Sequence, residues 1–527
     1  MSISKGSTAW RRTWVLLQRT LALAVAIVHF SEVPPALAQP FAVSGDVRVD
    51  PSRFRVTTFA EGLNFPYSMQ VLGDGSMLVA TSTPVTSSYF NSTGQLLRLV
   101  DANQDGIADG PGTTLFTGLP GIVTAVRQAG DLVLATSSQA GSERISVLRT
   151  GATPGASLSL LGSINFAFPV GWEHKSYTLE VRPTPAQSGK YDVFFNVGSK
   201  LNATNASDTV AVTGLVTGSV LGESIYQVTL QDLGSSVSFS NLTQIASGLR
   251  NAAGIAVEPA TGDLYFQDNG IDTPGNLGEP LSADEINRIP AAQIGGAVET
   301  FGFATDYIQY RTGTHVGSGA VQPLVSFQPI PDPWTGSESE GATEITFAPP
   351  DFPLGLNHGI FVGFHGQTQY AGLANEENPL LFVDPVTGQY FDFISNDEPG
   401  IGHLDSVVAS GRSLFVADLS STGALSGLGT GKIYQITYVP EPGDANLDGL
   451  VDGVDYVAWA DHFLQTGQTW RNGDFNGDGI VNGVDYTIWA DHYAPAGLSI
   501  LAVPEPSALA LAAIGVMGLL VAARRIR

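Results

Sequence analysis

The fold is decided by the stretch Gly248–Ile289, which reads GLRNAAGIAVEPATGDLYFQDNGIDTPGNLGEPLSADEINRI. It opens with a polar turn, runs through one apolar strand pattern to the turn dipeptide Gly262-Asp263, and continues into a second apolar run, Leu264–Phe266. A further strand pattern closes it at 285–289. Short apolar runs separated by Gly-Asp and Asn-Gly signals are typical of antiparallel β-structure.

The same two-part unit recurs six times between about Phe41 and Tyr438. In each unit an apolar strand is followed, after a variable loop, by a second strand that often carries Tyr or Arg. The first strands are 77–80, 132–135, 193–195, 264–266, 360–362 and 414–416, and their followers are 96–99, 145–148, 225–228, 285–288, 380–383 and 433–436. No unit can bury its own faces, so stacking around an axis is expected. The pattern predicts an all-β, six-bladed β-propeller over residues 41–439; a β-sandwich or a pair of barrels is the alternative.

Composition supports this fold class and excludes some partners. Only 14% of the 527 residues are charged, while 61 Gly and 31 Pro favour short strands and many turns. The formal net charge of −25 disfavours nucleic acid and anionic membranes as partners. Because the chain has no Cys, any metal must be held by oxygen or imidazole ligands.

The N-terminal residues 1–38 have the pattern of a signal peptide. Four basic residues precede the apolar run Leu21–Phe30, and the small-residue site Ala36-Leu37-Ala38 then precedes Gln39. The run is short for a membrane span, so we expect export with cleavage rather than an uncleaved anchor.

An internal duplication occupies residues 443–497, after the stiff linker 440–442. Each copy places side-chain oxygens at loop positions 1, 3, 5, 9 and 12, a backbone carbonyl at position 7 and Gly at position 6, which suits calcium. The first loop offers Asp444, Asn446, Asp448, Leu450, Asp452 and Asp455. The second offers Asp474, Asn476, Asp478, Ile480, Asn482 and Asp485. A helix should follow each loop.

The duplicated loops resemble the type I dockerin module, a small α-helical, EF-hand-like unit. The resemblance implies calcium and a cohesin-like partner; a structural spacer is the alternative.

A third loop lies inside the propeller and has the same oxygens at positions 1, 3, 5 and 9, but Gly112 at position 12. We expect a structural calcium site there, with a metal-free acidic turn as the alternative. Its ligands would be Asp101, Asn103, Asp105 and Asp109.

The C-terminal residues 503–527 contain Val503-Pro504-Glu505-Pro506, an apolar run at 508–523 and a basic end. This order resembles the PEP-CTERM sorting signal. The resemblance implies a terminal anchor helix that crosses the membrane transiently, recognition by an exosortase, removal of the tail, and delivery to the cell envelope surface or extracellular matrix. A plain tail anchor is the alternative.

The propeller itself resembles the soluble quinoprotein glucose/sorbosone dehydrogenases over residues 53–438, most closely at 248–289. That family oxidises sugars with pyrroloquinoline quinone (PQQ) and calcium. The resemblance implies that His174 is the general base for the anomeric hydroxyl and that Glu173 orients it. An imidazole suits this role because its pKa lies near working pH.

The resemblance also implies cofactor-binding residues. Arg250 and Asn251 would bind the quinone, the backbone carbonyls of Gly270 and Ile271 would help to hold the cofactor's calcium, and His403 stands where the family has Arg. The matching fifth-blade stretch, 337–343, is acidic and has no Lys. The carboxylates of PQQ need several cations, so this departure weighs against the cofactor.

Two functions follow from these observations. The first is an exported propeller that oxidises a sugar with PQQ and calcium. The second is a non-catalytic, calcium-binding propeller that binds a small carbohydrate or another surface ligand. The family match at His174, Arg250 and Asn251 favours oxidation, whereas the missing cations favour binding alone, so enzymatic activity is left open.

Overall fold

The structure is a computed structural model and describes residues 39–494 without 86–90, 140–142, 176–177, 207, 275, 330–340, 366–379, 396–400 and 423–427. The chain divides into two units, Met1–Gln39 and Pro40–Arg527, and every described helix and strand belongs to the second. The predicted signal peptide, 1–38, and the predicted sorting signal, 503–527, lie outside the described residues.

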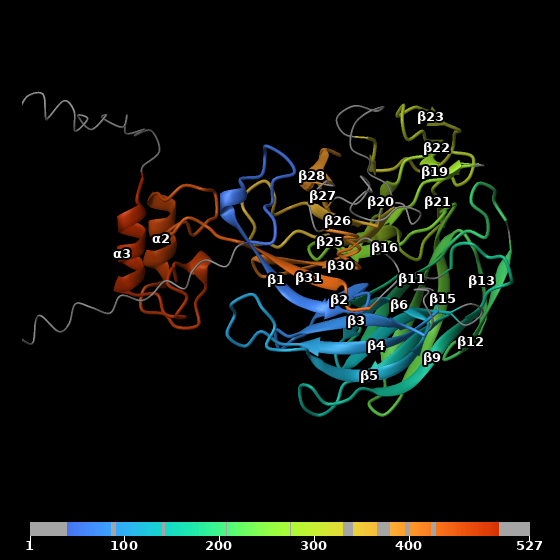
Figure 1. The fold of residues 1–527 in the computed structure, drawn as a ribbon, viewed down its shortest axis with the longest axis horizontal. Coiled ribbons are helices and arrows are strands. Elements are labelled where there is room, and N and C mark those ends of the chain that lie inside the picture. Colours follow the sequence, from blue (N-terminus) through green and yellow to red (C-terminus); the bar gives the residue numbers. More distant parts are fainter. Residues whose placement is uncertain are drawn as a thin grey trace, which may run out of the picture. The chain divides into compact units, whose positions relative to one another are not determined.

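Six antiparallel blades make up most of the second unit (Figure 1). Blade 1 contains β2 (Ser68–Val71), β3 (Met77–Pro84), β4 (Ser92–Leu99) and β5 (Thr113–Pro120). Blade 2 contains β6 (Ile122–Ala129), β7 (Leu132–Ser138), β8 (Glu143–Arg149) and β9 (Ser159–Ala167). Blade 3 contains β10 (Leu179–Pro183), β11 (Lys190–Val197), β14 (Ser224–Asp232) and β15 (Val237–Ser247).

The other three blades follow the same order from inner to outer strand. Blade 4 contains β16 (Gly254–Val257), β17 (Leu264–Asp268), β20 (Glu285–Ile289) and β24 (Val325–Ser326). Blade 5 contains β25 (Ala342–Phe347), β26 (Ile360–Phe364), β27 (Leu380–Val383) and β28 (Tyr390–Ile394). Blade 6 contains β29 (Ser406–Ser410), β30 (Ser413–Asp418), β31 (Gly431–Tyr438) and, as its outer strand, β1 (Phe54–Leu63).

The blades close into a ring through their innermost strands. Each of β2, β6, β10, β16, β25 and β29 lies against the next, and β29 lies against β2. The six-bladed propeller predicted from the recurring units is therefore confirmed. The predicted strands fall on the second and third strands of the six blades, which are the apolar strands that face two neighbouring blades.

The ring is joined by the N-terminal strand. β1 pairs antiparallel with β31, so that Phe54 faces Tyr438 and Val56 faces Ile436. Phe54 is 3% exposed and packs edge-on against Phe352 and Phe393 of blade 5, with ring centroids 5.5 and 5.3 Å apart. The first and last strands of the propeller thus share one hydrophobic core with blade 5.

Short insertions also tie neighbouring blades together. β12 (Thr209–Gly214) and β13 (Gly218–Leu221) leave blade 3 and extend blade 2, because β12 pairs with β9. β21 (Glu299–Thr300) pairs in parallel with β15 of blade 3. The remaining short elements are β18 (Asp272–Thr273), β19 (Asn276–Pro280), β22 (Tyr307–Ile308), β23 (His315–Val316), η1 (Pro51–Arg53), η2 (Ala291–Gln293) and η4 (Trp470–Asn472).

The duplicated region contains α2 (Gly453–His462) and α3 (Gly483–His492), which lie side by side in Figure 1. Each helix begins with a capping box, formed by Asp452 with Asp455 and by Asn482 with Asp485. The predicted EF-hand-like unit with a helix after each loop is therefore confirmed. Within the described residues, no helix has both the length and the apolar character needed to cross a membrane.

Replacing Phe54 with Ala should open the ring closure. We expect Phe54→Ala to lower the free energy of unfolding by about 3–5 kcal/mol, because it leaves a cavity among three aromatic neighbours. Arg55→Ala, on the exposed side of the same strand, should change it by less than about 0.5 kcal/mol. Urea unfolding of the two variants measures the difference, and equal values would show that the closure contributes little.

Candidate functional site

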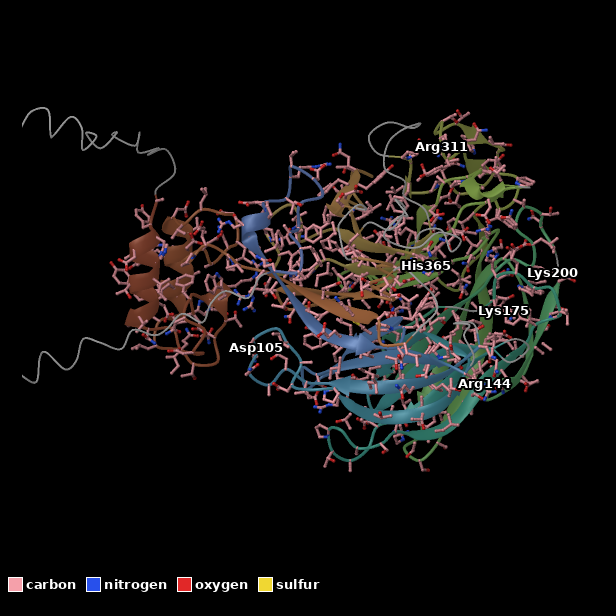
Figure 2. All side chains as sticks on the ribbon, in the orientation of Figure 1. Asp105, Arg144, Lys175, Lys200, Arg311 and His365 are labelled. Carbon is pink, nitrogen blue, oxygen red and sulfur yellow. The ribbon has the colours of Figure 1, made fainter. Side chains whose placement is uncertain are left out.

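One hydrogen bond recurs from blade to blade and brings the predicted site residues to the same end of the propeller. The residue at the end of the second strand donates its N–H to a carbonyl just before the innermost strand of the same blade. The pairs are Ser82–Asn64 (2.9 Å), Gly198–Lys175 (3.2 Å), Asn269–Asn251 (3.2 Å), His365–Gly341 (2.8 Å) and Leu419–His403 (2.8 Å). Lys175 and His365 are labelled in Figure 2. We call this end, built by the segments that precede the innermost strands, the mouth.

Buried carboxylates hold two of the mouth segments. Asp268, at the end of β17, accepts the backbone N–H groups of Arg250 (3.0 Å) and Asn251 (2.7 Å). Asp418, at the end of β30, accepts those of Gly402 and His403, both at 3.0 Å. Burial raises the pKa of each carboxyl to about 7. These acids therefore serve as structural caps for the loops that carry the site.

His174 is held in the tautomer that a general base needs. Its Nδ1 lies 3.0 Å from Ser199 Oγ, and that hydroxyl donates to the Leu201 carbonyl at 2.8 Å. Because the serine proton is used there, His174 Nδ1 donates, and Nε2 keeps its lone pair. Burial and the nearby charge of Arg250 lower the pKa of His174 well below its usual value. The imidazole is neutral at neutral pH.

Glu173 does not orient this ring, contrary to the prediction. The Glu173 side chain is exposed, and the partner of the His174 ring is Ser199. The backbone N–H groups of Glu173 and His174 donate to the Lys200 and Ser199 carbonyls, at 3.1 and 3.0 Å. Ser199, and not Glu173, therefore fixes the orientation of the His174 ring.

Arg250 is already neutralised by an acid. Its Nη2 lies 2.7 Å from Asp272 Oδ2, and both Nε and Nη2 donate to Asn202 Oδ1, at 3.1 and 2.9 Å. Arg250 is only 6% exposed. Next to it, Asn251 donates from Nδ2 to Asn269, while its buried Oδ1 has no hydrogen-bond partner among the described residues. This part of the mouth therefore presents an acceptor and not an uncompensated cation.

The turn at Gly270 and Ile271 is occupied by internal hydrogen bonds. The Gly270 N–H donates to Asp284 and the Ile271 N–H to Ser282 Oγ, both at 2.7 Å. The Ile271 carbonyl accepts from the N–H groups of Leu281 (2.7 Å) and Ser282 (3.2 Å). Both lone pairs of this predicted calcium ligand are therefore used within the loop.

His403 is not exposed at the mouth in the place of the arginine of the resembling family. The residue is fully buried, its ring stacks on His365 with centroids 4.5 Å apart, and its Nδ1 lies 2.5 Å from the His365 carbonyl. The carboxylate at this place faces His365, whose Nδ1 lies 2.6 Å from Asp405. Burial opposes protonation, but the Asp405 carboxylate outweighs it and raises the pKa of His365. Sequence reasoning missed this pair, although His403-Leu404-Asp405 and the fifth-blade His365 were visible.

A buried ion cluster between the innermost strands was also missed. Arg127 of β6 pairs with Glu180 of β10 at 2.7 Å and with Glu344 of β25 at 2.6 Å. Ser406 of β29 donates to the same Glu344. The cluster borders a cavity of about 290 Å³ that is formed at the ends of the innermost strands, away from the mouth. It links blades 2, 3, 5 and 6 across the axis.

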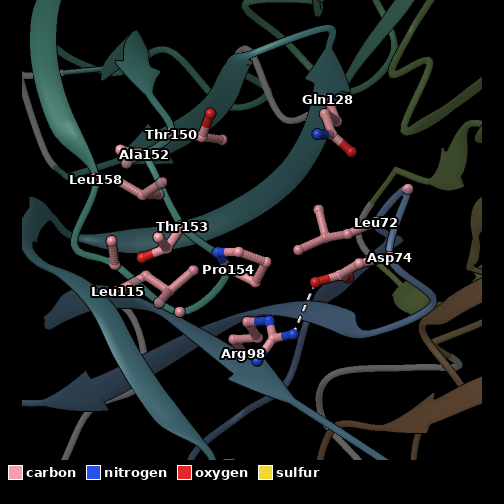
Figure 3. Close-up of a pocket in the computed structure, with 14 residues that line it drawn as sticks. Leu72, Asp74, Arg98, Leu115, Gln128, Thr150, Ala152, Thr153, Pro154 and Leu158 are labelled. Carbon is pink, nitrogen blue, oxygen red and sulfur yellow. Dashed lines mark hydrogen bonds and ion pairs between the residues drawn. The ribbon is translucent and has the colours of Figure 1, made fainter.

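A second cavity of about 250 Å³ lies between blades 1 and 2 (Figure 3). Its walls include Leu72, Leu115 and Leu158, and Arg98 pairs with Asp74 at 2.7 Å on one side. A hydrogen bond from Ser76 and the nearby Arg98 lower the pKa of Asp74 to about 2. Leu72, Gly73 and Asp74 of its lining follow the innermost strand of blade 1, so this cavity lies at the end opposite the mouth, which we call the closed end.

The mouth does not fit an anionic cofactor. Every Lys, Arg and His between residues 39 and 494 lies in the described part of the chain. Of those at the mouth, Lys175 pairs with Glu143 at 2.7 Å, Arg250 with Asp272 and His365 with Asp405. Each of these three side chains already faces an acid, so none of them is a free cation for the carboxylates of PQQ.

The three predicted calcium loops share one hydrogen-bond pattern. The first-position carboxylate accepts the N–H of the glycine at position 6 at 2.8–2.9 Å. The Asp at position 5 accepts the N–H at position 7, also at 2.8–2.9 Å. The three loops thus share one backbone turn and carry Asp and Asn oxygens, which are the hard-oxygen donors that calcium prefers.

Buried carboxylates in the duplicated loops strengthen this fit. Asp444, Asp455, Asp474 and Asp485 are at most 3% exposed, and burial raises the pKa of Asp444 to about 6. Among the described residues, no three or more His, Cys, Asp or Glu side chains are arranged as a ready-made metal site.

The propeller loop compensates for its missing twelfth ligand. In the duplicated loops, the position-12 carboxylates of Asp455 and Asp485 accept the N–H at position 2. In the propeller loop, Asp109 at position 9 accepts the corresponding N–H of Ala102 at 2.8 Å. Asp109 therefore takes over the structural part of that role.

Comparisons with known proteins agree with this architecture. Residues 442–490 match the dockerin type I domain model, and residues 502–526 match the PEP-CTERM protein-sorting motif. The sorting motif indicates export and association with the envelope surface. Both resemblances inferred from the sequence are confirmed. No curated protein matches the chain.

Among solved structures, the chain is similar to PQQ-bound aldose sugar dehydrogenase from Streptomyces coelicolor, at 17% identity and a TM-score of 0.47, covering 74% of this chain and 99% of that one. It is also similar to the PQQ domain of pyranose dehydrogenase from Coprinopsis cinerea (15%, TM-score 0.44, 73% and 95% covered). A Trichoderma reesei protein of carbohydrate-active enzymes family AA12 is similar at 14% (TM-score 0.46, 76% and 98% covered). At these values the propeller assignment rests on the chain's own closed ring of blades.

Glu285 should make stability depend on pH. Burial and the neighbouring Asp268 raise its pKa to about 8, from 4.5. Between these values the folded state holds a proton that the unfolded chain releases, so stability falls as pH rises through this window. We expect Glu285→Gln to stabilise the protein by about 1–3 kcal/mol at pH 8 and far less at pH 5. Thermal unfolding at both pH values checks this, with the exposed Glu61→Gln as control.

The propeller loop should bind calcium together with the duplicated loops. We expect calorimetric titration of the exported chain with calcium to show three sites. Asp105→Ala, which removes a position-5 oxygen, should leave two. Asp461→Ala, on the exposed side of α2 and outside the loops, should leave three. Three sites in the Asp105→Ala variant would show that the propeller loop is an acidic turn without metal.

Proposed function

We propose that the chain is an exported, calcium-binding propeller that holds a neutral carbohydrate at its mouth. One observation carries the proposal: the mouth offers hydrogen-bond acceptors, while its Lys175, Arg250 and His365 are each paired with an acid. His174 Nε2 and the buried Asn251 Oδ1 both need donors, and sugar hydroxyls supply them. An anionic ligand would instead need the donors that Asp272 and Asp405 already occupy.

Sugar oxidation with PQQ and calcium is the second candidate, and the state of His174 favours it. A neutral imidazole whose Nδ1 is fixed by Ser199 can take a proton from a bound hydroxyl at Nε2. The resembling family uses a histidine in that role. The paired Arg250 and the buried His403 weigh against this candidate, because they leave the cofactor's carboxylates without partners.

The rest of the chain completes the proposal. Residues 1–38 would direct export and 503–527 would be processed by an exosortase, leaving the protein at the envelope surface or in the extracellular matrix. The propeller would span 41–439, the linker 440–442 and the dockerin-like repeats 443–497. The repeats would bind calcium and a cohesin-like domain.

Ligand titration separates the two candidates. Calorimetry with neutral mono- and oligosaccharides should show binding that weakens about tenfold in His174→Ala and in Asn251→Ala, since each loses one acceptor. His492→Ala, at the end of α3 in the duplicated region, should bind like the parent protein. In parallel, PQQ is titrated into the protein with excess calcium, and its binding is measured by the quinone absorbance.

Stoichiometric PQQ binding would contradict the carbohydrate-only proposal and support a dehydrogenase, which a sugar screen would then identify. Sugar binding without PQQ binding would support the proposal. Absence of both, at affinities weaker than roughly −4 kcal/mol, would remove the mouth as a carbohydrate site.

A further inference from the structure

The first duplicated loop carries a strained residue. Position 4 has a left-handed backbone in all three calcium loops, at Gln104 (φ 57°), Leu447 (φ 62°) and Gly477 (φ 73°). Glycine adopts this conformation without cost, whereas a leucine with a Cβ pays conformational strain. Gln104 is exposed, but Leu447 is only 1% exposed. The strain at Leu447 therefore needs a compensating contact.

That contact is with the propeller. The Leu447 side chain belongs to the hydrophobic cluster that contains Phe54, Phe352 and Tyr438, the same cluster that closes the ring of blades. Its carbonyl accepts the N–H of Leu354 at 3.1 Å. Leu354 lies in the segment that follows the innermost strand of blade 5, so Leu447 docks at the closed end.

Polar contacts surround this buried leucine. Arg471 pairs with Asp351 at 2.5 Å and donates to the Pro350 carbonyl at 2.7 Å. The guanidinium of Arg412 lies 5.2 Å from the centre of the Trp470 ring. On the linker side, Arg53 pairs with Glu441 at 2.9 Å. An apolar centre with a polar rim is the anatomy of a specific interface and not of a loose tether.

The same interface is tied to the calcium ligands of the first loop. Leu447 lies between the ligands Asn446 and Asp448, and its own N–H donates to Asp444 Oδ1 at 2.7 Å. Trp470 Nε1 donates to the Asp444 carbonyl at 2.5 Å. A calcium ion drawn to these oxygens would therefore fix the turn that presents Leu447. The second loop has Gly477 at this position and offers no side chain to bury.

We propose that the first calcium loop is a docked part of the propeller's closed end, and that calcium in this loop fixes the repeat pair on the propeller. The second loop completes the repeat pair without taking part in the docking. A partner bound by the repeats is consequently held at the end opposite the mouth, which stays open to its ligand.

Amide hydrogen exchange of the exported chain in calcium tests the docking, because the Leu354 N–H reports on the interface directly. In Leu447→Gly, the segment 350–356 should exchange about tenfold faster, since the backbone strain is relieved but the buried side chain is lost. Leu464→Gly is the matched control: Leu464 is also left-handed (φ 65°) but is 71% exposed. It should leave exchange at 350–356 unchanged.

A second pair of variants tests the calcium linkage. Asp448→Ala and Asp478→Ala remove the same position-5 ligand from the first and second loops. Only Asp448→Ala should accelerate exchange at 350–356 in calcium, to the level that a chelator produces in the parent protein. Equal effects of the two variants would overturn the assignment to the first loop. Equal exchange in Leu447→Gly, Leu464→Gly and the parent protein would overturn the docking itself.

Discussion

The pairing of β1 with β31 is the constraint on which the rest of the structure depends. A propeller blade has two apolar faces, so an open row of blades would leave the first and last exposed to water. Here the outer strand of blade 6 comes from the N-terminal end of the propeller, and its Phe54 enters a core that also contains residues of blade 5. Ring closure thus couples residues far apart in the chain into one cooperative unit.

At the mouth, the buried charged groups form hydrogen bonds and ion pairs within the protein. Asp268 and Asp418 look like candidate ligands by residue type, but their oxygens accept backbone N–H groups that shape the loops around Asn251 and His403. Lys175, Arg250 and His365 each face an acid. With these charges compensated, the acceptors that still need donors, His174 Nε2 and the buried Asn251 Oδ1, are neutral, which favours hydroxyl-rich ligands over anionic ones.

The two ends of the propeller have different roles. The mouth is formed by segments that precede the innermost strands, whereas the calcium loop at Asp101, the docked loop at Leu447 and both cavities lie where strands leave toward the closed end. The propeller loop also reaches β1, because Ala108 donates to the Phe59 carbonyl at 2.8 Å. The predicted calcium loop and the attached repeats therefore lie toward the closed end, away from the mouth.

The sequence by itself determined the features that rest on local pattern. Strand periodicity located the middle strands of all six blades, and Asp/Asn spacing located three loops with one shared turn, because both depend on residues within one short segment. The innermost strands were less visible, since they carry polar residues such as Arg127, Glu180 and Glu344 that are satisfied only across the axis.

Only the tertiary structure decided which of the residues suited to ligand binding lack a partner within the protein. Sequence matching placed His174, Arg250 and Asn251 at one site, but the pairing of Arg250 with Asp272, the stacking of His403 on His365 and the outward turn of Glu173 depend on loops from different blades. Leu447 is a further example: its left-handed backbone is offset only by burial of its side chain in the propeller core. Such contacts join residues distant in sequence, and no local spacing encodes them.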